Sequence, residues 1–122
     1  MVAKAEVEEL LSELQSLASF VSTDLVEISS GTSMGGIYGI PDMDSTGICK
    51  TFTVVLNEID AAFSTINVPG VTGIKVKTAG PVVFIQVVDS NHYIGLAIGN
   101  PEEANVAADK LNGVVEQMKT IL

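Results

Sequence analysis

The first forty residues contain two hydrophobic patterns with different periods. From residue 3 to 19 apolar residues recur at helical spacing with glutamates elsewhere on the wheel, which predicts an amphipathic helix. Its apolar positions are Leu10, Leu11, Leu14, Leu17 and Ala18. Thr23 to Ser29 instead alternates apolar and polar residues, as a half-buried strand does. After a glycine-rich turn at 31–36, Ile37 to Ile40 can pair back as a second strand, which ends at Pro41.

A second helix is predicted from about Ile48 to Ile66, with Asp44 or Ser45 as its N-cap. At about 100° per residue its apolar residues fall within one arc of roughly 120°, which we expect to face a sheet. They are Ile48, Phe52, Val55, Leu56, Ile59, Ala62, Phe63 and Ile66. On nearly the opposite side, Lys50, Val54 and Ala61 form a narrow patch whose small residues would let another helix approach closely. We expect a partner contact on that patch.

Three strands in succession follow the second helix. Residues 71–78 alternate Ile74 and Val76 with Lys75 and Lys77, a pattern typical of an edge strand. Residues 82–88 are apolar on both faces and predict a central strand. The last strand, 92–98, contains a glycine at 95 that leaves room for a helix to lie close.

Asn100 and Pro101 are the preferred residue types for the N-cap and first position of a third helix, which we expect to run to the end of the chain. Its predicted apolar side consists of Ala104, Ala107, Ala108, Leu111, Val114, Val115, Met118 and Ile121. The predicted element order is therefore helix, two strands, helix, three strands, helix, which is an α+β arrangement. A length of 122 residues suits a single domain covering 1–122.

The charge balance excludes several classes of partner. The net charge is −9, and the six basic residues are all lysines. A nucleic acid is therefore not expected as a partner, because binding phosphates requires a basic patch, usually with arginine. Without arginine the chain also cannot supply an arginine finger to a nucleotide hydrolase, so any stimulation must reposition the partner's own groups.

Hydrophobicity predicts an interface and not a membrane span. Apolar residues make up 47% of the chain, and we expect part of this surplus at a contact surface. The longest apolar run, 81–88, is interrupted by Gln86 and is far shorter than the roughly 20 residues of a membrane span. Glutamates interrupt the first twenty residues, where a secretory signal would need an apolar core, so we expect a cytoplasmic protein.

No catalytic, cofactor or metal site is predicted. Cys49, the only cysteine, is expected to be a buried apolar residue. His92 lies beside Ser90 and Asp89, but neighbours in a strand and turn do not converge as a catalytic triad must. The glycines between 31 and 39 lack the Lys-Ser/Thr element of a phosphate loop, and Asp42 and Asp44 lack a calcium-loop pattern. The sequence therefore favours a protein that is not an enzyme.

With this element order, the whole chain resembles the Roadblock/LC7 family. The most similar part is the last third: the apolar strand Val82 to Val88, the turn Asp89-Ser90-Asn91, the strand Tyr93 to Ile98, and Asn100-Pro101-Glu102 opening the last helix. The resemblance implies a five-stranded antiparallel sheet with the middle helix on one face and the terminal helices on the other. It also implies that two subunits join through their middle helices and third strands.

Members of this family are regulators or scaffolds of small Ras-like GTPases, or light chains of motor complexes, and are not enzymes. The resemblance thus implies a homodimer that binds such a GTPase and needs no cofactor. The expected dimer or partner interface comprises Lys50, Val54, Glu58, Ala61, Thr65, Ile74, Lys75, Val76 and Lys77. The alternative is a small-molecule sensor or ligand-binding module of profilin-like or PAS-like shape, although few aromatic residues are present to line a pocket.

Overall fold

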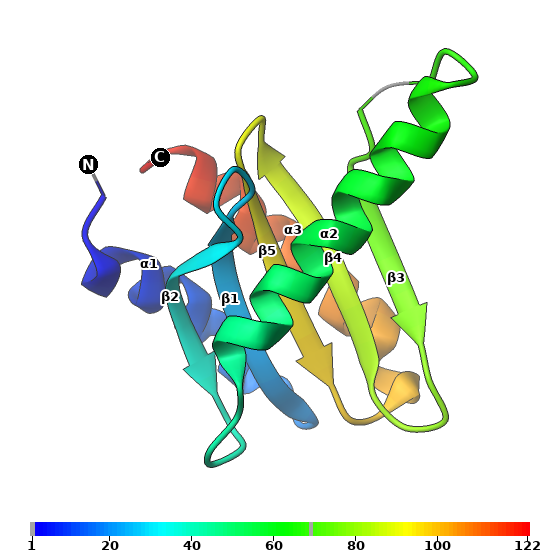
Figure 1. Ribbon diagram of the computed structural model, residues 1–122. Coiled ribbons are helices and arrows are strands. Elements are labelled where there is room, and N and C mark those ends of the chain that lie inside the picture. Colours follow the sequence, from blue (N-terminus) through cyan, green and yellow to red (C-terminus); the bar gives the residue numbers. More distant parts are fainter. Residues whose placement is uncertain (1, 69) are drawn as a thin grey trace.

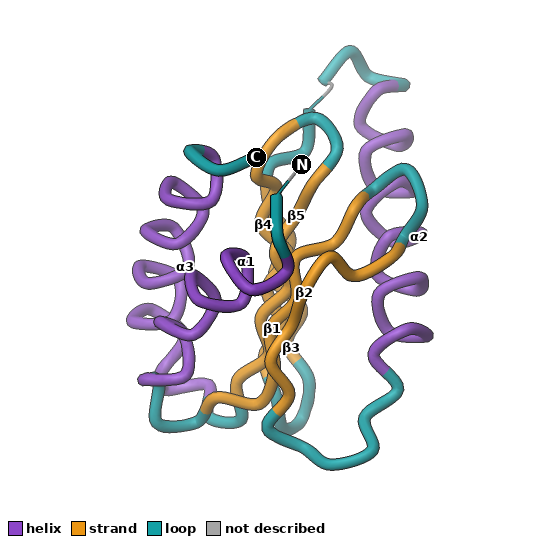
Figure 2. Tube along the Cα trace, turned by 90° about the vertical axis from the view of Figure 1, so that its left-hand side faces the viewer, coloured by secondary structure: helices purple, strands orange, loops and turns teal. Residues whose placement is uncertain are grey.

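The computed structural model describes residues 2–68 and 70–122 as three layers (Figures 1 and 2). The helices are α1 (Lys4–Leu11), η1 (Ser12–Ser16), α2 (Ser45–Ser64), η2 (Pro101–Glu103) and α3 (Ala104–Lys119). The strands are β1 (Phe20–Glu27), β2 (Thr32–Tyr38), β3 (Gly73–Lys77), β4 (Val82–Asp89) and β5 (His92–Ile98). They form one antiparallel sheet in the order β2-β1-β5-β4-β3. Helix α2 covers one face, and α1 with α3 covers the other, so the predicted α+β fold and layer arrangement are confirmed.

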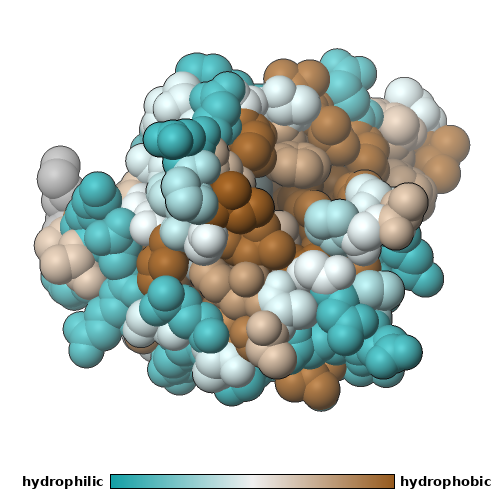
Figure 3. All heavy atoms as spheres, turned by 90° about the horizontal axis from the view of Figure 1, so that it is seen from below, coloured by the Kyte–Doolittle hydropathy of each residue, from teal (hydrophilic) through white to brown (hydrophobic). Residues whose placement is uncertain are grey.

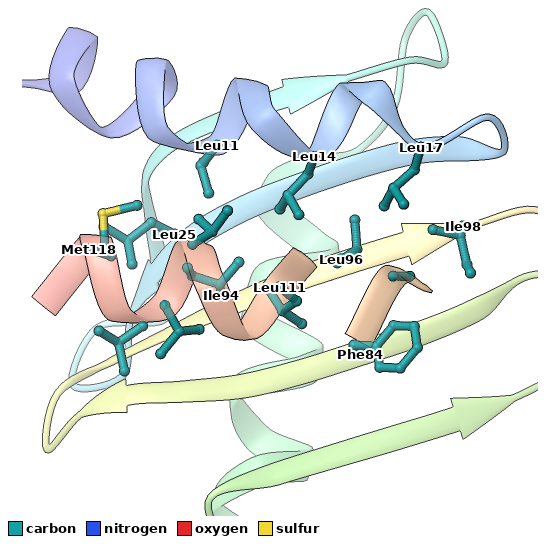
Figure 4. Close-up of a cluster of buried hydrophobic side chains, with 14 of the residues drawn as sticks. Leu11, Leu14, Leu17, Leu25, Phe84, Ile94, Leu96, Ile98, Leu111 and Met118 are labelled. Atoms are coloured by element: carbon teal, nitrogen blue, oxygen red, sulfur yellow. The ribbon is translucent and has the colours of Figure 1, made fainter. Parts of the chain in front are cut away.

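The larger core lies between the sheet and the terminal helices. Leu11 of α1, Leu14 of η1 and Leu111 of α3 project onto Leu25, Ile94 and other side chains of the sheet (Figure 4). Their side chains are almost completely buried. The predicted apolar side of the last helix is confirmed, because its buried positions are Ala104, Ala107, Leu111, Val114, Val115 and Met118. The helix ends at Lys119, slightly before the chain does.

Glu103 joins the start of α3 to the segment that precedes β1. Its carboxylate accepts hydrogen bonds from the backbone N–H groups of Ala18 and Ser19, at 2.8 and 2.9 Å, and from the Ser19 hydroxyl. These hydrogen bonds favour the charged form and hold the pKa of Glu103 below its ordinary value. The two helices on this face are thereby connected at one end of the sheet.

The smaller core lies beneath α2. It contains Val26, Cys49, Leu56, Ile85 and Tyr93, and half-buried apolar residues surround it. Cys49 is a free, buried thiol, as expected. Burial raises its pKa to about 12, so it stays a thiol and is not a reactive thiolate.

The first hairpin lies earlier in the chain than predicted. β1 begins at Phe20 and β2 at Thr32, because the tight turn is made around Gly31, whose φ is +68°. The interpretation of this first strand as half-buried was wrong. β1 pairs with both β2 and β5 and is buried on both faces, including the polar residues Ser22, Thr23 and Asp24.

The predicted N-cap residues Asp44 and Asn100 are confirmed, whereas the predicted length of the first helix is not. Asp44 Oδ1 accepts from the backbone N–H of Gly47 at 3.1 Å, and Asn100 Oδ1 accepts from that of Glu102 at 3.0 Å. The predicted first helix instead tightens into the 3₁₀ segment η1 after Leu11. There the Ser12 and Ser16 hydroxyls bond to carbonyls three residues earlier.

Helix α2 does not pack as its apolar arc predicted. Its buried residues are Cys49, Thr53 and Leu56, so the side that faces the sheet is rotated by roughly a quarter of a turn from the centre of that arc. Ile48, Ala62, Phe63 and Ile66 of the predicted arc are exposed instead. The cause is the buried hydroxyl of Thr53, which is hydrogen-bonded to Tyr93 of β5 and so turns this side of the helix toward the sheet.

Candidate protein-interaction surface

An apolar groove lies between the N-terminal half of α2 and the end of the sheet that is drawn at the bottom of Figure 1. It has a volume of about 380 Å³. Ile48 and Phe52 line it from the helix, Val83 and Ala97 from the strands, and Ile40 from the loop after β2. Figure 3 views this end of the molecule, where apolar side chains gather around a hollow.

Gly95 forms part of the floor of this groove. We expected a helix to lie close to this glycine, but a Cβ built there would meet only one atom, Tyr93 Cε1, at 4.0 Å. Within the described chain, the space above Gly95 is therefore not filled by α2. The prediction of a closely packed helix at this point was wrong for a single copy of the chain.

A buried hydrogen-bond network sets the position of α2 above the sheet. The Thr53 hydroxyl donates to the Cys49 carbonyl at 2.7 Å, and the Tyr93 hydroxyl lies 2.9 Å from Thr53 Oγ1 and 3.1 Å from that carbonyl. Tyr93 is almost fully buried, which raises its pKa to about 12. The network requires the Thr53 side of the helix to face β5, and the apolar side to turn toward the groove and solvent.

Asp24 is a buried carboxylate at the upper side of the groove. Its Oδ1 accepts from the Ser33 hydroxyl at 2.5 Å and from the Tyr38 hydroxyl at 2.6 Å. Burial raises the pKa of Asp24 above its ordinary value, although these two hydrogen bonds act in the opposite direction. Asp24 was not predicted as a candidate, because an aspartate that follows two polar residues in a strand gave no sign that both sheet faces would be covered there.

The C-terminal part of α2 projects beyond the sheet (Figure 1). Phe63 is 45% exposed there, and Ile66 and Val68, just after the helix, are 63% and 53% exposed. This overhanging end is nevertheless held in place. Asn67 adopts a left-handed conformation with φ of +62°, and the Val68 N–H bonds to the Phe63 carbonyl. Asp60 Oδ1 also accepts from the backbone N–H groups of Gly70 and Val71.

The predicted edge strand lies at the sheet edge below this end of α2. Among the described strands, β3 pairs only with β4, which confirms its edge position. Ile74 and Val76 are half-buried, and Ile74 packs against the core under α2. Lys75 and Lys77 are exposed on the opposite face. The strand therefore presents an unpaired backbone edge with one apolar and one basic side.

The five helix residues predicted for the interface lie together on the side of α2 that faces away from the sheet. Lys50, Val54, Glu58, Ala61 and Thr65 are all exposed, and Val54 is 58% exposed. This outward face is separate from the flank that borders the groove. The structure thus divides α2 into a sheet-facing side, an apolar flank and a mixed outward face.

The residues considered as candidate catalysts have structural roles. Asp89 Oδ1 accepts from the Asn91 N–H at 2.9 Å and lies 2.7 Å from His92 Nδ1, so the carboxylate closes the β4–β5 turn. The described residues contain no group of three or more His, Cys, Asp or Glu side chains placed to hold a metal ion. Among residues 2–68 and 70–122, no helix combines the length and hydrophobicity that crossing a bilayer requires.

Comparison with known proteins identifies the fold through structure and not through sequence. No protein-family model matches the chain, and no curated protein matches it. Solved structures, by contrast, do match the chain. Myxococcus xanthus MglB is 11% identical with a TM-score of 0.87, and the match covers 95% of this chain and 94% of that one. A Roadblock/LC7 domain from Streptomyces avermitilis is 17% identical with a TM-score of 0.81, covering 92% and 93%.

A third similar structure, the gliding protein MglB from Thermus thermophilus, is 9% identical with a TM-score of 0.72. It matches over 93% of this chain and 91% of its own length. Nearly the whole chain is thus superimposable on these domains although few residues are shared. The resemblance in element order is confirmed at the level of architecture: the chain has the Roadblock/LC7 fold.

Proposed function

We propose that residues 1–122 form a single Roadblock/LC7-like domain that acts in the cytoplasm as a homodimeric, non-enzymatic regulator or scaffold of a small Ras-like GTPase. The observation that carries the dimer is self-complementarity. One chain contains both an apolar groove with unfilled space over Gly95 and an ordered, exposed apolar helix end at Phe63, Ile66 and Val68. A monomer would leave both in water.

Symmetric pairing of β3 would bring these two features together. Antiparallel pairing of two β3 edges, about a two-fold axis perpendicular to the sheet, would extend the sheet across both subunits. The same half-turn would reverse the partner's α2 and place its overhanging end over the part of the sheet that the first α2 leaves open. Ile74 and Val76 would then lie beneath both helices. Each copy would fill the groove of the other.

The GTPase partner is supported by the fold and by the outward face of α2. The mixed face of Lys50, Val54, Glu58, Ala61 and Thr65 stays exposed in the proposed dimer, and its copies lie on the same side of the joined sheet. We assign this face to the GTPase. Because the chain contains no arginine, the regulator would act by positioning the GTPase's own residues or by localising it.

The dimer is tested by comparing Ile66→Asp with Val106→Asp. Ile66, just after α2, and Val106, in α3, are 63% and 54% exposed, so both variants should fold. In sedimentation velocity experiments the wild type and Val106→Asp should be dimers. Ile66→Asp should weaken the dimer by about 100-fold or more, since two side chains each lose about 1.5–3 kcal/mol of burial. A wild-type monomer at micromolar concentration would refute the proposed assembly.

GTPase binding is tested separately with a panel of purified small Ras-like GTPases in their GDP-bound and GTP-analogue-bound forms. Binding is measured by biolayer interferometry, and nucleotide turnover by phosphate release. Val54→Asp should reduce binding while sedimentation still shows a dimer, whereas Val106→Asp should change neither. A dimer that binds no member of the panel in either nucleotide state would count against the GTPase assignment and leave the dimer standing.

The groove also supports the second candidate, a small-molecule sensor. Its volume of about 380 Å³ and its apolar lining fall within the range of ligand pockets. Native mass spectrometry of freshly purified protein distinguishes the two. A retained small molecule on a monomer would favour the sensor, and a ligand-free dimer would favour the regulator.

A further inference from the structure

Two lysines on β3 form a basic site that remains exposed in the proposed dimer. Lys75 and Lys77 are separated by one residue, so their side chains lie on the same face of the sheet, about 7 Å apart along the strand. That face is the one covered by α3. The Lys75 ammonium lies 5.8 Å from the ring centre of Phe84, a residue of the larger core. Both lysines are exposed.

A hollow of about 210 Å³ lies beside these lysines, between the β3 edge and the residues of η2 and the start of α3. Val82, Pro101 and Ala104 provide an apolar lining, and besides the two lysines the hollow is lined by Asn105 and by one acidic residue, Glu102. Among the described residues, the only lysine in an ion pair is Lys119, with Glu116. Lys75 and Lys77 therefore carry charges that no carboxylate within 4 Å balances in the described part of the chain.

The proposed dimer would concentrate this charge. A two-fold axis perpendicular to the sheet keeps each face of β3 on the same side, so the lysines of both copies would line one seam, opposite the two α2 helices. Like charges facing each other across paired strands are destabilising. An anionic partner along the seam would remove this repulsion. This inference therefore rests on the dimer of the proposed function.

We propose that the Lys75–Lys77 seam is a docking site for an acidic, extended peptide segment of a partner protein. The side chains at alternate positions of an extended peptide repeat at about the same 7 Å spacing as the two lysines, so successive carboxylates can reach successive ammonium groups. The hollow lined by Val82, Pro101 and Ala104 offers apolar contact beyond the charges.

The spacing of the two lysines favours an extended peptide over a single phosphate group, and charge restricts where such a peptide binds. The protein carries a net charge of −9, so most of its surface repels an acidic segment. The seam of the dimer would be the one place where two lysine pairs meet.

The test uses a fluorescein-labelled oligoglutamate peptide and the variant Lys75→Gln/Lys77→Gln. The matched control is Lys110→Gln/Lys119→Gln, which removes the same charge from exposed positions of α3. Fluorescence anisotropy should show binding to the wild type that weakens with added salt. The β3 variant should bind at least about tenfold more weakly, because four ion pairs per dimer are lost, and the α3 control should bind like the wild type.

Sedimentation velocity on the same samples separates this inference from the proposed function. The β3 variant should remain a dimer at least as strong as the wild type, and the peptide should tighten the wild-type dimer, because ligand and dimer are thermodynamically linked. A wild-type dimer that does not bind the peptide, or equal loss of binding in both variants, would overturn the docking site and leave the dimer intact. Tighter binding of inorganic tripolyphosphate than of the peptide would overturn the choice of ligand. A wild-type monomer would overturn both proposals.

Discussion

The two faces of the sheet are built from similar residues but are packed very differently. On the face of α1 and α3, leucine and isoleucine side chains from two directions are almost completely buried, including Leu14, Ile94 and Leu111. On the other face a single helix covers a smaller cluster, and a groove remains beside it. The first face stabilises the chain by itself, while the second has the open apolar surface typical of a contact with another molecule.

The difference follows from how the helices are attached. On the first face the apolar sides of α1 and α3 point directly at the sheet. On the second, Thr53 and Tyr93 hold α2 through hydrogen bonds, and much of its apolar arc points sideways. Because these hydrogen bonds fix the rotation of α2, part of its apolar side does not pack against the sheet and remains available for an interface.

The largest expected effect is on the well-packed face. Leu111→Ala and Leu56→Ala remove the same atoms from positions that are 1% and 3% exposed, under α3 and α2 respectively. Leu111→Ala should cost about 4 kcal/mol of unfolding free energy and Leu56→Ala about 2 kcal/mol, since the looser layer can relax into the cavity. Urea unfolding followed by circular dichroism measures both. Equal costs would mean that the two faces are packed equally well.

A smaller effect is expected from the polar anchor of α2. Tyr93→Phe removes the hydroxyl that contacts Thr53 and the Cys49 carbonyl while keeping the buried ring. We expect a loss of about 1 kcal/mol in unfolding free energy, because Thr53 still donates to the same carbonyl. Hydrogen exchange should increase in α2 and remain unchanged in α3. A uniform increase in both helices would contradict the role of this tyrosine as a local anchor.

The smallest effect is expected at Asp24 and depends on pH. Burial raises the pKa of this carboxyl in the folded state, so its contribution to stability is fully present below its unfolded pKa and is lost as pH rises through the folded pKa. Asp24→Asn keeps an oxygen to accept from Ser33 and Tyr38 and carries no charge. The variant should have the higher Tm near neutral pH, and the difference should vanish below a pH of about 4.

The control for this prediction is Asp109→Asn, which removes one charge from an exposed position of α3. It should show no comparable dependence on pH. If Asp24→Asn instead lowered the Tm at neutral pH, the charged carboxylate would be stabilising the junction of β1 and β2, and the burial argument would be wrong.

Most elements could be predicted from the sequence because their signals are local. The apolar side of α3 and the two capping residues Asp44 and Asn100 depend only on residues within a few positions of one another. The edge position of β3 could also be predicted from the sequence, since lysines at alternate positions are typical of edge strands. The first hairpin was misplaced because its ends depend on the turn at Gly31 and on pairing with β5, which is distant in sequence.

The sequence by itself determined the order of elements, the absence of arginine and the excess of apolar residues, all of which point toward an interaction domain and away from phosphate chemistry. Only the tertiary structure decided where that excess lies. The rotation of α2 depends on one hydrogen-bond network, in which Tyr93 of β5 contacts Thr53 and Cys49, two neighbours on α2. Tyr93 is distant in sequence and reaches them only when β5 lies beneath the helix. Helical periodicity shows which residues share a side but not which way that side turns, because the direction is set by contacts with distant strands.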